Sequence, residues 1–84
     1  MKNRLDCAIL EVMLVKCRAV SNMSAATCKV ISSEMDIKVD TLYRRLAGLA
    51  GHGYVEKGIL DRREHTYYVT AKGKQALKEA KDEK

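Results

Sequence analysis

The chain has 84 residues, of which 46% are hydrophobic, so it has material for one modest core and no room for a second domain. A formal net charge of +5 favours an anionic partner, although net charge bears on association and not on fold. No segment approaches the roughly 18 consecutive apolar residues of a membrane span, and the N-terminus lacks the cleavage site of a signal peptide.

The cysteines and histidines give no sign of a reactive centre. Cys7, Cys17 and Cys28 are odd in number and fit no metal-binding spacing. We interpret them as buried, reduced thiols that act as small hydrophobic side chains, with redox sensing as the alternative. His52 and His65 lie beside no plausible nucleophile or paired carboxylates. We therefore expect a cytoplasmic protein of one domain, residues 1–84, that is not an enzyme, with no cofactor, no metal site and no membrane partner.

The first predicted helix covers residues 3–18 and is apolar on nearly all sides. One apolar line follows the spacing of a core-facing helix side, and a second line runs beside it. A small domain can hardly bury such a helix alone. Either neighbouring helices cover both sides, or one side is a contact between two copies of the chain, with a contribution from the C-terminal helix as a further option. The two lines are Leu5, Ala8, Ile9, Val12 and Val15, and Cys7, Leu10, Met13, Leu14 and Cys17.

A helix-turn-helix is predicted over about residues 24–52. Its first helix, residues 25–35, follows several side chains of the N-cap type in residues 21–24. Asp36 suits a turn that needs left-handed backbone geometry, and Ile37 then lies against the core beneath it. The inward line of this helix is Cys28, Ile31 and Met35.

The next helix, residues 39–52, separates an apolar stripe from a polar face. Its stripe is Val39, Leu42, Leu46 and Leu49. In a recognition helix the N-terminal turns reach base edges in the DNA major groove, where Arg pairs with guanine and Thr contacts a thymine methyl or a phosphate. The alternative is a solvated helix face with a weak pair between Asp40 and Arg44. The polar face carries Lys38, Asp40, Thr41, Arg44 and Arg45.

Two short strands and a charged loop predict a β-wing over about residues 54–69. Residues 54–59 and 66–69 are rich in β-branched and aromatic side chains, and Gly53 precedes them as a left-handed helix stop. We expect Tyr67 and Val69 to face the core. Arg62, Arg63 and His65 would hold a DNA backbone or enter a minor groove, although a solvated tip is the alternative because Asp61 and Glu64 offset the charges. Thr70 then caps a last helix over residues 71–81.

The C-terminal half resembles the winged helix-turn-helix regulators, most closely the PadR-like family and less closely the MarR-like regulators. The motifs that carry this resemblance are Thr41-Leu42-Tyr43 followed by Leu46 and Leu49, then Gly53-Tyr54-Val55, then Tyr67-Tyr68-Val69-Thr70-Ala71-Lys72-Gly73. It implies an α+β, mostly helical fold with a three-helix bundle, a two-stranded wing and a short C-terminal helix. It also implies dimeric binding of double-stranded DNA, with residues 38–45 in the major groove and a wing at residues 61–65.

Some residues depart from this pattern. Lys38 stands where such regulators usually place a Ser cap, and Gly48 and Gly51 each weaken the helix by roughly 1 kcal/mol relative to Ala.

We expect a transcriptional regulator that acts as a repressor. The alternative is a winged-helix module that binds a protein and reads no DNA.

Overall fold

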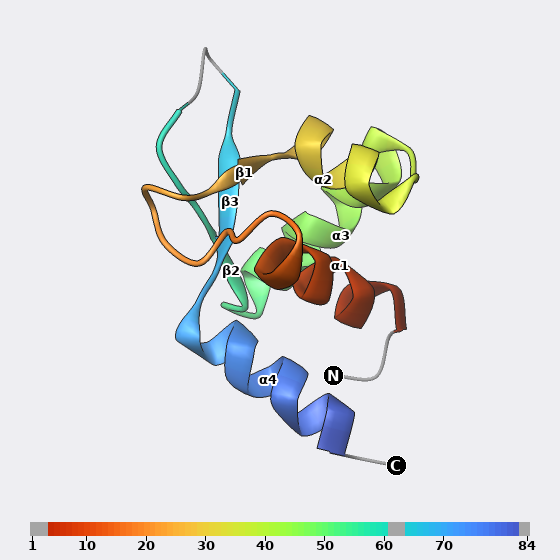
Figure 1. Cartoon of the computed structure of the whole chain (residues 1–84), viewed down its shortest axis with the longest axis vertical. Coiled ribbons are helices and arrows are strands. Elements are labelled where there is room, and N and C mark those ends of the chain that lie inside the picture. The colour runs from red at the N-terminus through yellow and green to blue at the C-terminus, as the bar shows by residue number, and fades with distance from the viewer. Residues whose placement is uncertain (1–3, 61–63, 83–84) are drawn as a thin grey trace.

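The computed structural model describes residues 4–60 and 64–82, which form four helices and three short strands (Figure 1). The sheet stands on one side of α1, α2 and α3, and α4 lies at the end of the molecule where β3 finishes. In chain order the elements are α1 (Arg4–Val15), β1 (Ala26–Thr27), α2 (Cys28–Met35), α3 (Val39–Gly51), β2 (Val55–Lys57), β3 (Thr66–Val69) and α4 (Ala71–Asp82).

The predicted two-stranded wing forms, and a third strand joins it. The sheet order is β1-β3-β2 and both pairings are antiparallel. On one side β3 pairs with β2, where Tyr67 lies opposite Lys57, and on the other side it pairs with β1, where Tyr67 lies opposite Ala26. Because residues 26–27 are extended, α2 begins at Cys28, three residues later than predicted. Its cap is Thr27, whose hydroxyl accepts a hydrogen bond of 3.3 Å from the backbone N–H of Val30.

The core lies where the helices meet the sheet. Tyr67 and Val69 face it as predicted, and Leu42, Leu46 and Leu49 of the predicted α3 stripe are buried there. Val39, the first member of that stripe, is 44% exposed, so the prediction that it is buried was wrong. The three cysteines are free thiols packed against the core, as predicted, but they are half-buried, so the prediction that they are buried was only partly right. The largest fully buried side chains are Ile9, Leu10, Met13, Ile31, Leu42, Leu46, Val55 and Val69.

Two left-handed residues shape the connections on either side of α3. Asp36 has φ 54° and ends α2, and its backbone N–H bonds the carbonyl of Ser32, as the predicted turn requires. Ile37 packs partly buried against the core beneath this turn. Gly53 has φ 79° and follows α3, where a left-handed conformation suits glycine. Both turns therefore form at the residues that the sequence predicted for them.

Candidate nucleic-acid interface

The outer face of α3 brings together three of the predicted DNA-binding residues. Thr41, Arg44 and Arg45 are exposed and line a shallow depression of about 280 Å³. They come together because the apolar side of the helix is held by Leu42, Leu46 and Leu49, which turns the polar side outward. Two guanidinium groups beside a hydroxyl form a donor set that suits phosphate oxygens and base edges.

The N-terminal end of α3 carries the other two predicted residues of this helix. Lys38 is the N-cap, with φ −68° and ψ 141°, and makes no side-chain cap hydrogen bond, as the sequence predicted. Asp40 lies in the first turn, where a carboxylate is favourable for the helix dipole. Both side chains are exposed. Lys38 and the first-turn N–H groups are therefore at the same end of α3 as Thr41.

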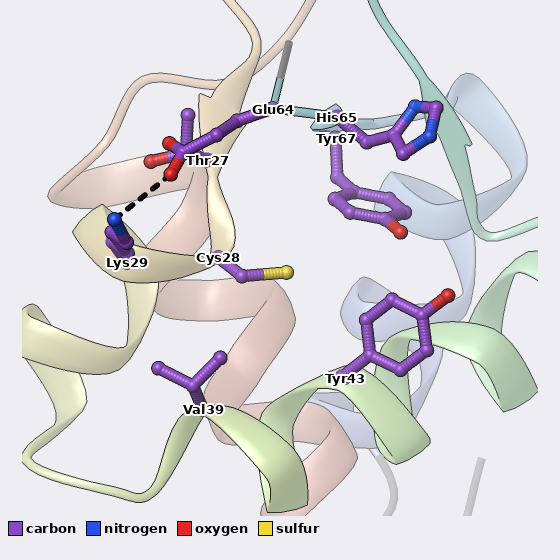
Figure 2. A pocket seen from close by; sticks show the side chains of 8 residues that line it. All are labelled: Thr27, Cys28, Lys29, Val39, Tyr43, Glu64, His65 and Tyr67. Carbon is purple, nitrogen blue, oxygen red and sulfur yellow. Dashed lines mark ion pairs between the residues drawn. The ribbon is translucent and has the colours of Figure 1, made fainter.

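The wing side of the interface is described only in part. His65 is exposed at the base of the wing, just before β3. Arg62 and Arg63 lie outside the described residues, so their predicted contacts stay predictions. Next to His65, the carboxylate of Glu64 lies 2.9 Å from the Lys29 ammonium, and this ion pair joins the wing base to the start of α2 (Figure 2). This ion pair therefore connects the wing to the helix-turn-helix, and the sequence did not predict it.

A recess separates α3 from the base of the wing, and we call it the wing recess. It has a volume of about 190 Å³ and a mostly apolar lining, and its α3 wall is formed by Val39 and Tyr43 (Figure 2). Tyr43 is 53% exposed and was not among the residues predicted to bind DNA. The signal was available in the helical spacing, since Tyr43 lies about 100° from Leu42 around the axis, outside the buried stripe. The remaining lining residues are Thr27, Cys28, Lys29, Glu64, His65 and Tyr67.

The Cys28 thiol and the Tyr67 hydroxyl, which we call the floor of the wing recess, are uncharged at neutral pH. Burial, followed by the nearby Glu64 carboxylate, raises the pKa of the Cys28 thiol above its ordinary value. Burial is likewise the main cause that raises the pKa of the Tyr67 hydroxyl. Both groups therefore keep their protons under physiological conditions and behave as weakly polar surface.

A second hollow lies on α1, away from α3. It has a volume of about 290 Å³ and a mostly apolar lining, and Val15 at its edge is 65% exposed. Glu11, which lines this hollow, also contacts α4, because the Lys81 ammonium lies 2.7 Å from the Glu11 carboxylate. We call this hollow the α1 groove; its lining residues are Ala8, Glu11, Val12, Val15 and Lys16.

Residues 4–60 and 64–82 contain neither a membrane-spanning helix nor a metal-binding cluster. No helix within these ranges is long and apolar enough to cross a membrane. Within the same ranges, no group of three or more His, Cys, Asp and Glu side chains is placed to hold a metal ion.

Comparison with solved structures identifies the architecture. TubR from Bacillus megaterium pBM400 superposes with a TM-score of 0.75 at 20% identity, over 94% of this chain and 87% of that chain. The fold is a winged helix. The solution structure of the DNA-binding TubR fragment from Clostridium botulinum also shares this winged helix, with a TM-score of 0.72 at 19% identity over 95% of this chain and 99% of that chain.

The sequence alone gives no comparable match. Neither a protein-family model nor a curated protein matches this chain. The winged-helix part of the predicted resemblance is therefore confirmed by the structures, whereas membership of the PadR-like family stays a prediction.

Proposed function

We propose that this winged helix binds double-stranded DNA, with α3 in the major groove and the wing on the adjacent backbone or minor groove. The observation that carries the proposal is the exposed cluster of Thr41, Arg44 and Arg45 on the helix that precedes the wing. It is supported by the similarity of the whole fold to the DNA-binding TubR fragment from Clostridium botulinum.

The proposed residues have different roles. Arg44 and Arg45 present forked donors that match guanine O6 and N7 or phosphate oxygens, and Thr41 contacts a base or a phosphate. Lys38 approaches the DNA backbone from the N-terminus of α3. The Asp40 carboxylate accepts a hydrogen bond from a cytosine amino group or orients a neighbouring Arg. Arg62, Arg63 and His65 bind the backbone beside the groove in this proposal. No catalytic residue, metal or cofactor takes part.

A salt series tests duplex binding directly. Affinity for random duplex DNA should fall steeply as salt rises, because each neutralised phosphate releases counterions. The double variant Arg44→Ala with Arg45→Ala should bind more weakly and show a shallower slope. The double variant Lys74→Ala with Lys78→Ala is the matched control, because it also removes two positive charges from exposed positions, but on α4, away from the proposed interface. Absence of duplex binding by the wild type even at low salt would contradict the proposal.

We further propose that DNA binding represses transcription, as in the PadR-like regulators that the sequence resembles. A protein seated in the major groove over a promoter excludes polymerase by occupying the same surface. Selection of bound fragments from a random duplex pool gives the preferred site. Placed across a promoter, that site should lower transcription in a purified system when the protein is added. Unchanged transcription at saturating occupancy would leave DNA binding in place and remove the repressor role.

We also propose a homodimer through the α1 groove, with α4 contributing at its edge through Lys81 and Glu11. Dimerisation would present two α3 helices to a pseudo-palindromic site. The same exposed groove supports the second candidate function, a winged-helix module that binds another protein. The salt series separates the two, because a protein-binding module has no need of phosphate contacts.

A further inference from the structure

The wing recess is an apolar hollow beside the polar outer face of α3. Its α3 wall, Val39 and Tyr43, is exposed, and Figure 2 shows the Cys28 thiol pointing into the space between Tyr43 and Tyr67. On one side it is closed by the 2.9 Å ion pair between Lys29 and Glu64. Because these two charges are paired with each other and the Cys28 thiol and the Tyr67 hydroxyl keep their protons, these four lining side chains offer little to attract a phosphate.

The recess is continuous with the proposed DNA interface. Tyr43 precedes Arg44 in α3, and the two side chains lie about 100° apart around the helix axis. The opposite wall is the wing base, where His65 is also a proposed DNA contact. A duplex held by both α3 and the wing must therefore cover the recess, and the group that fills it must be one that the duplex displays in its major groove.

Resting on the duplex binding proposed above, we propose that the wing recess receives the C5-methyl group of one or two successive thymines. The thymine methyl is the apolar group that base pairs display in the major groove. The volume of about 190 Å³ accepts a methyl together with the edge of the pyrimidine that carries it. Val39 and the ring of Tyr43 would contact the methyl from the helix side, and Cys28 and Tyr67 would lie beneath it.

This assignment makes the protein a reader of thymine as well as of guanine. Arg44 and Arg45 can recognise guanine by hydrogen bonds, but they do not distinguish thymine from cytosine by an apolar contact. The wing recess supplies that contact at the flank of α3 nearest the wing. The preferred site should therefore contain a thymine at a constant distance from the position that Arg44 reads.

Replacing thymine with deoxyuridine tests the proposal, because it removes the methyl and keeps the hydrogen bonds of the base pair. A duplex selected from a random pool is prepared in a series in which each thymine is replaced singly. We expect one or two adjacent positions to lose affinity by roughly three- to ten-fold, the range for burying one methyl group, while the other positions stay unchanged. The unaffected positions are the internal control.

Two variants then locate the contact. Tyr43→Ala should abolish most of the methyl effect at the sensitive position, whereas Tyr43→Phe should keep it because the ring remains. Val39→Ala should reduce it in the same way. Since both side chains are about half exposed, these variants should fold like the wild type.

The outcomes separate this inference from the function on which it rests. Failure of the wild type to bind any duplex overturns the proposed function. Duplex binding with no thymine position sensitive to methyl removal overturns the thymine contact alone and leaves the recess to a protein partner. A sensitive position that responds equally in wild type, Tyr43→Ala and Val39→Ala places the methyl elsewhere on the protein and also overturns the inference.

Discussion

Two helical glycines, Gly48 in α3 and Gly73 in α4, have opposite surroundings. A Cβ at Gly48 would meet no atom within 4 Å, whereas a Cβ at Gly73 would overlap the backbone carbonyl of Tyr54 and lie 2.8 Å from Cγ1 of Val69. Gly48→Ala should therefore raise the free energy of unfolding by about 0.5–1 kcal/mol, through the better helix propensity of alanine. Gly73→Ala should lower it by about 1–3 kcal/mol, because backbone must move to make room.

Thermal unfolding of the two variants measures this contrast. A change of about 1 kcal/mol moves the Tm of a domain of this size by roughly 4–8 °C. Gly51→Ala serves as a second open-site control, since its added Cβ would also meet nothing within 4 Å. Equal Tm values for Gly73→Ala and wild type would show that α4 does not pack on Tyr54 as closely as the structure places it.

The Cys28 thiol provides a pH-dependent prediction. Its pKa is raised by burial first and by the Glu64 carboxylate second, so the folded chain keeps this proton at a pH where the unfolded chain has begun to lose it. Alkylation of Cys28 near pH 8 should be slower in the folded protein than in denaturant. By the same linkage, this group stabilises the fold below the ordinary thiol pKa, and that contribution is lost as pH rises through the raised folded-state value.

The cause of the raised pKa is tested by the rate at which Cys28 is alkylated in the folded protein, measured as a function of pH. Glu64→Gln should lower the pKa, because it removes the negative charge, but should leave the part that comes from burial. Lys29→Gln is the matched control, because it breaks the same 2.9 Å ion pair and keeps the carboxylate. Equal midpoints for Glu64→Gln and wild type would assign the whole shift to burial.

Arg44 gives a prediction about base reading. If its guanidinium pairs with guanine, Arg44→Ala should lose about 1–3 kcal/mol of discrimination at one base position. Arg63→Ala should weaken binding to all sequences alike if that residue holds a phosphate, as predicted for the wing. Competition between selected and scrambled duplexes at constant salt measures both effects. Uniform losses for Arg44→Ala would mean that Arg44 positions the protein without reading a base.

At the residue scale, burial on α3 was predictable for three of four stripe positions. Leu42, Leu46 and Leu49 are buried because they lie within one narrow sector of the helix. Val39 fits the same spacing, yet it lies in the first turn, where α3 has passed beyond the core and the wing recess begins. A periodic pattern records direction around a helix but not how far along it the core extends.

At the scale of elements, Thr70 joins three parts of the chain. Its hydroxyl donates a hydrogen bond of 2.6 Å to the carbonyl of Gly53 and accepts one of 3.0 Å from the N–H of Gly73. The first bond holds the turn after α3, and the second caps α4, as the sequence predicted. One side chain therefore links the turn after α3, the end of β3 and α4.

Thr70→Val should lower the free energy of unfolding by about 1–2 kcal/mol, since it keeps the shape and removes both hydrogen bonds. Thr70→Ser keeps the hydroxyl and is the matched control. Hydrogen exchange should show faster exchange at the N–H of Gly73 in Thr70→Val. If Thr70→Val and Thr70→Ser are equally stable, the hydroxyl contributes nothing and the packing of β3 alone holds the junction.

Elements with local signals were predicted well, and β1 was not. The helices follow from periodicity and caps within a few residues, and the turn at Asp36 follows from one residue type. Ala26 and Thr27 have no comparable signal, because they become a strand only by pairing with Thr66 and Tyr67, which lie about forty positions later. Non-local pairing of so short a strand cannot be read from local composition.

At the scale of the whole molecule, the winged helix was predicted from the order of its elements, while its surfaces needed the structure. The outward direction of Thr41, Arg44 and Arg45 follows from the α3 stripe, but the wing recess depends on three segments meeting: the start of α2, the outer flank of α3 and the base of the wing. The α1 groove likewise results from the elements that pack against α1, namely α2, α4 and β3, leaving one side of it uncovered.

Oligomeric state is the prediction that belongs to this scale. Val15 is the suitable probe of the proposed α1 contact, because it is 65% exposed, whereas its neighbour Leu14 packs against the core. Wild-type protein should sediment at about twice the 9.4 kDa of one chain, and Val15→Asp should sediment as a monomer. A charge within an apolar contact between copies would have to be desolvated, which costs more than such a contact gains.

The control for Val15→Asp is Met23→Asp, which adds the same charge at a side chain that is 82% exposed and lies outside the α1 groove. Met23→Asp should keep the wild-type Tm, whereas the Tm of Val15→Asp should not depend on protein concentration, because loss of the dimer removes the stabilisation that association gives. On a duplex with two half-sites, Val15→Asp should lose the avidity of paired binding, but on a single half-site it should match Met23→Asp. A monomeric wild type would remove the dimer and leave the α1 groove to a different protein, with DNA binding through one α3 helix unaffected.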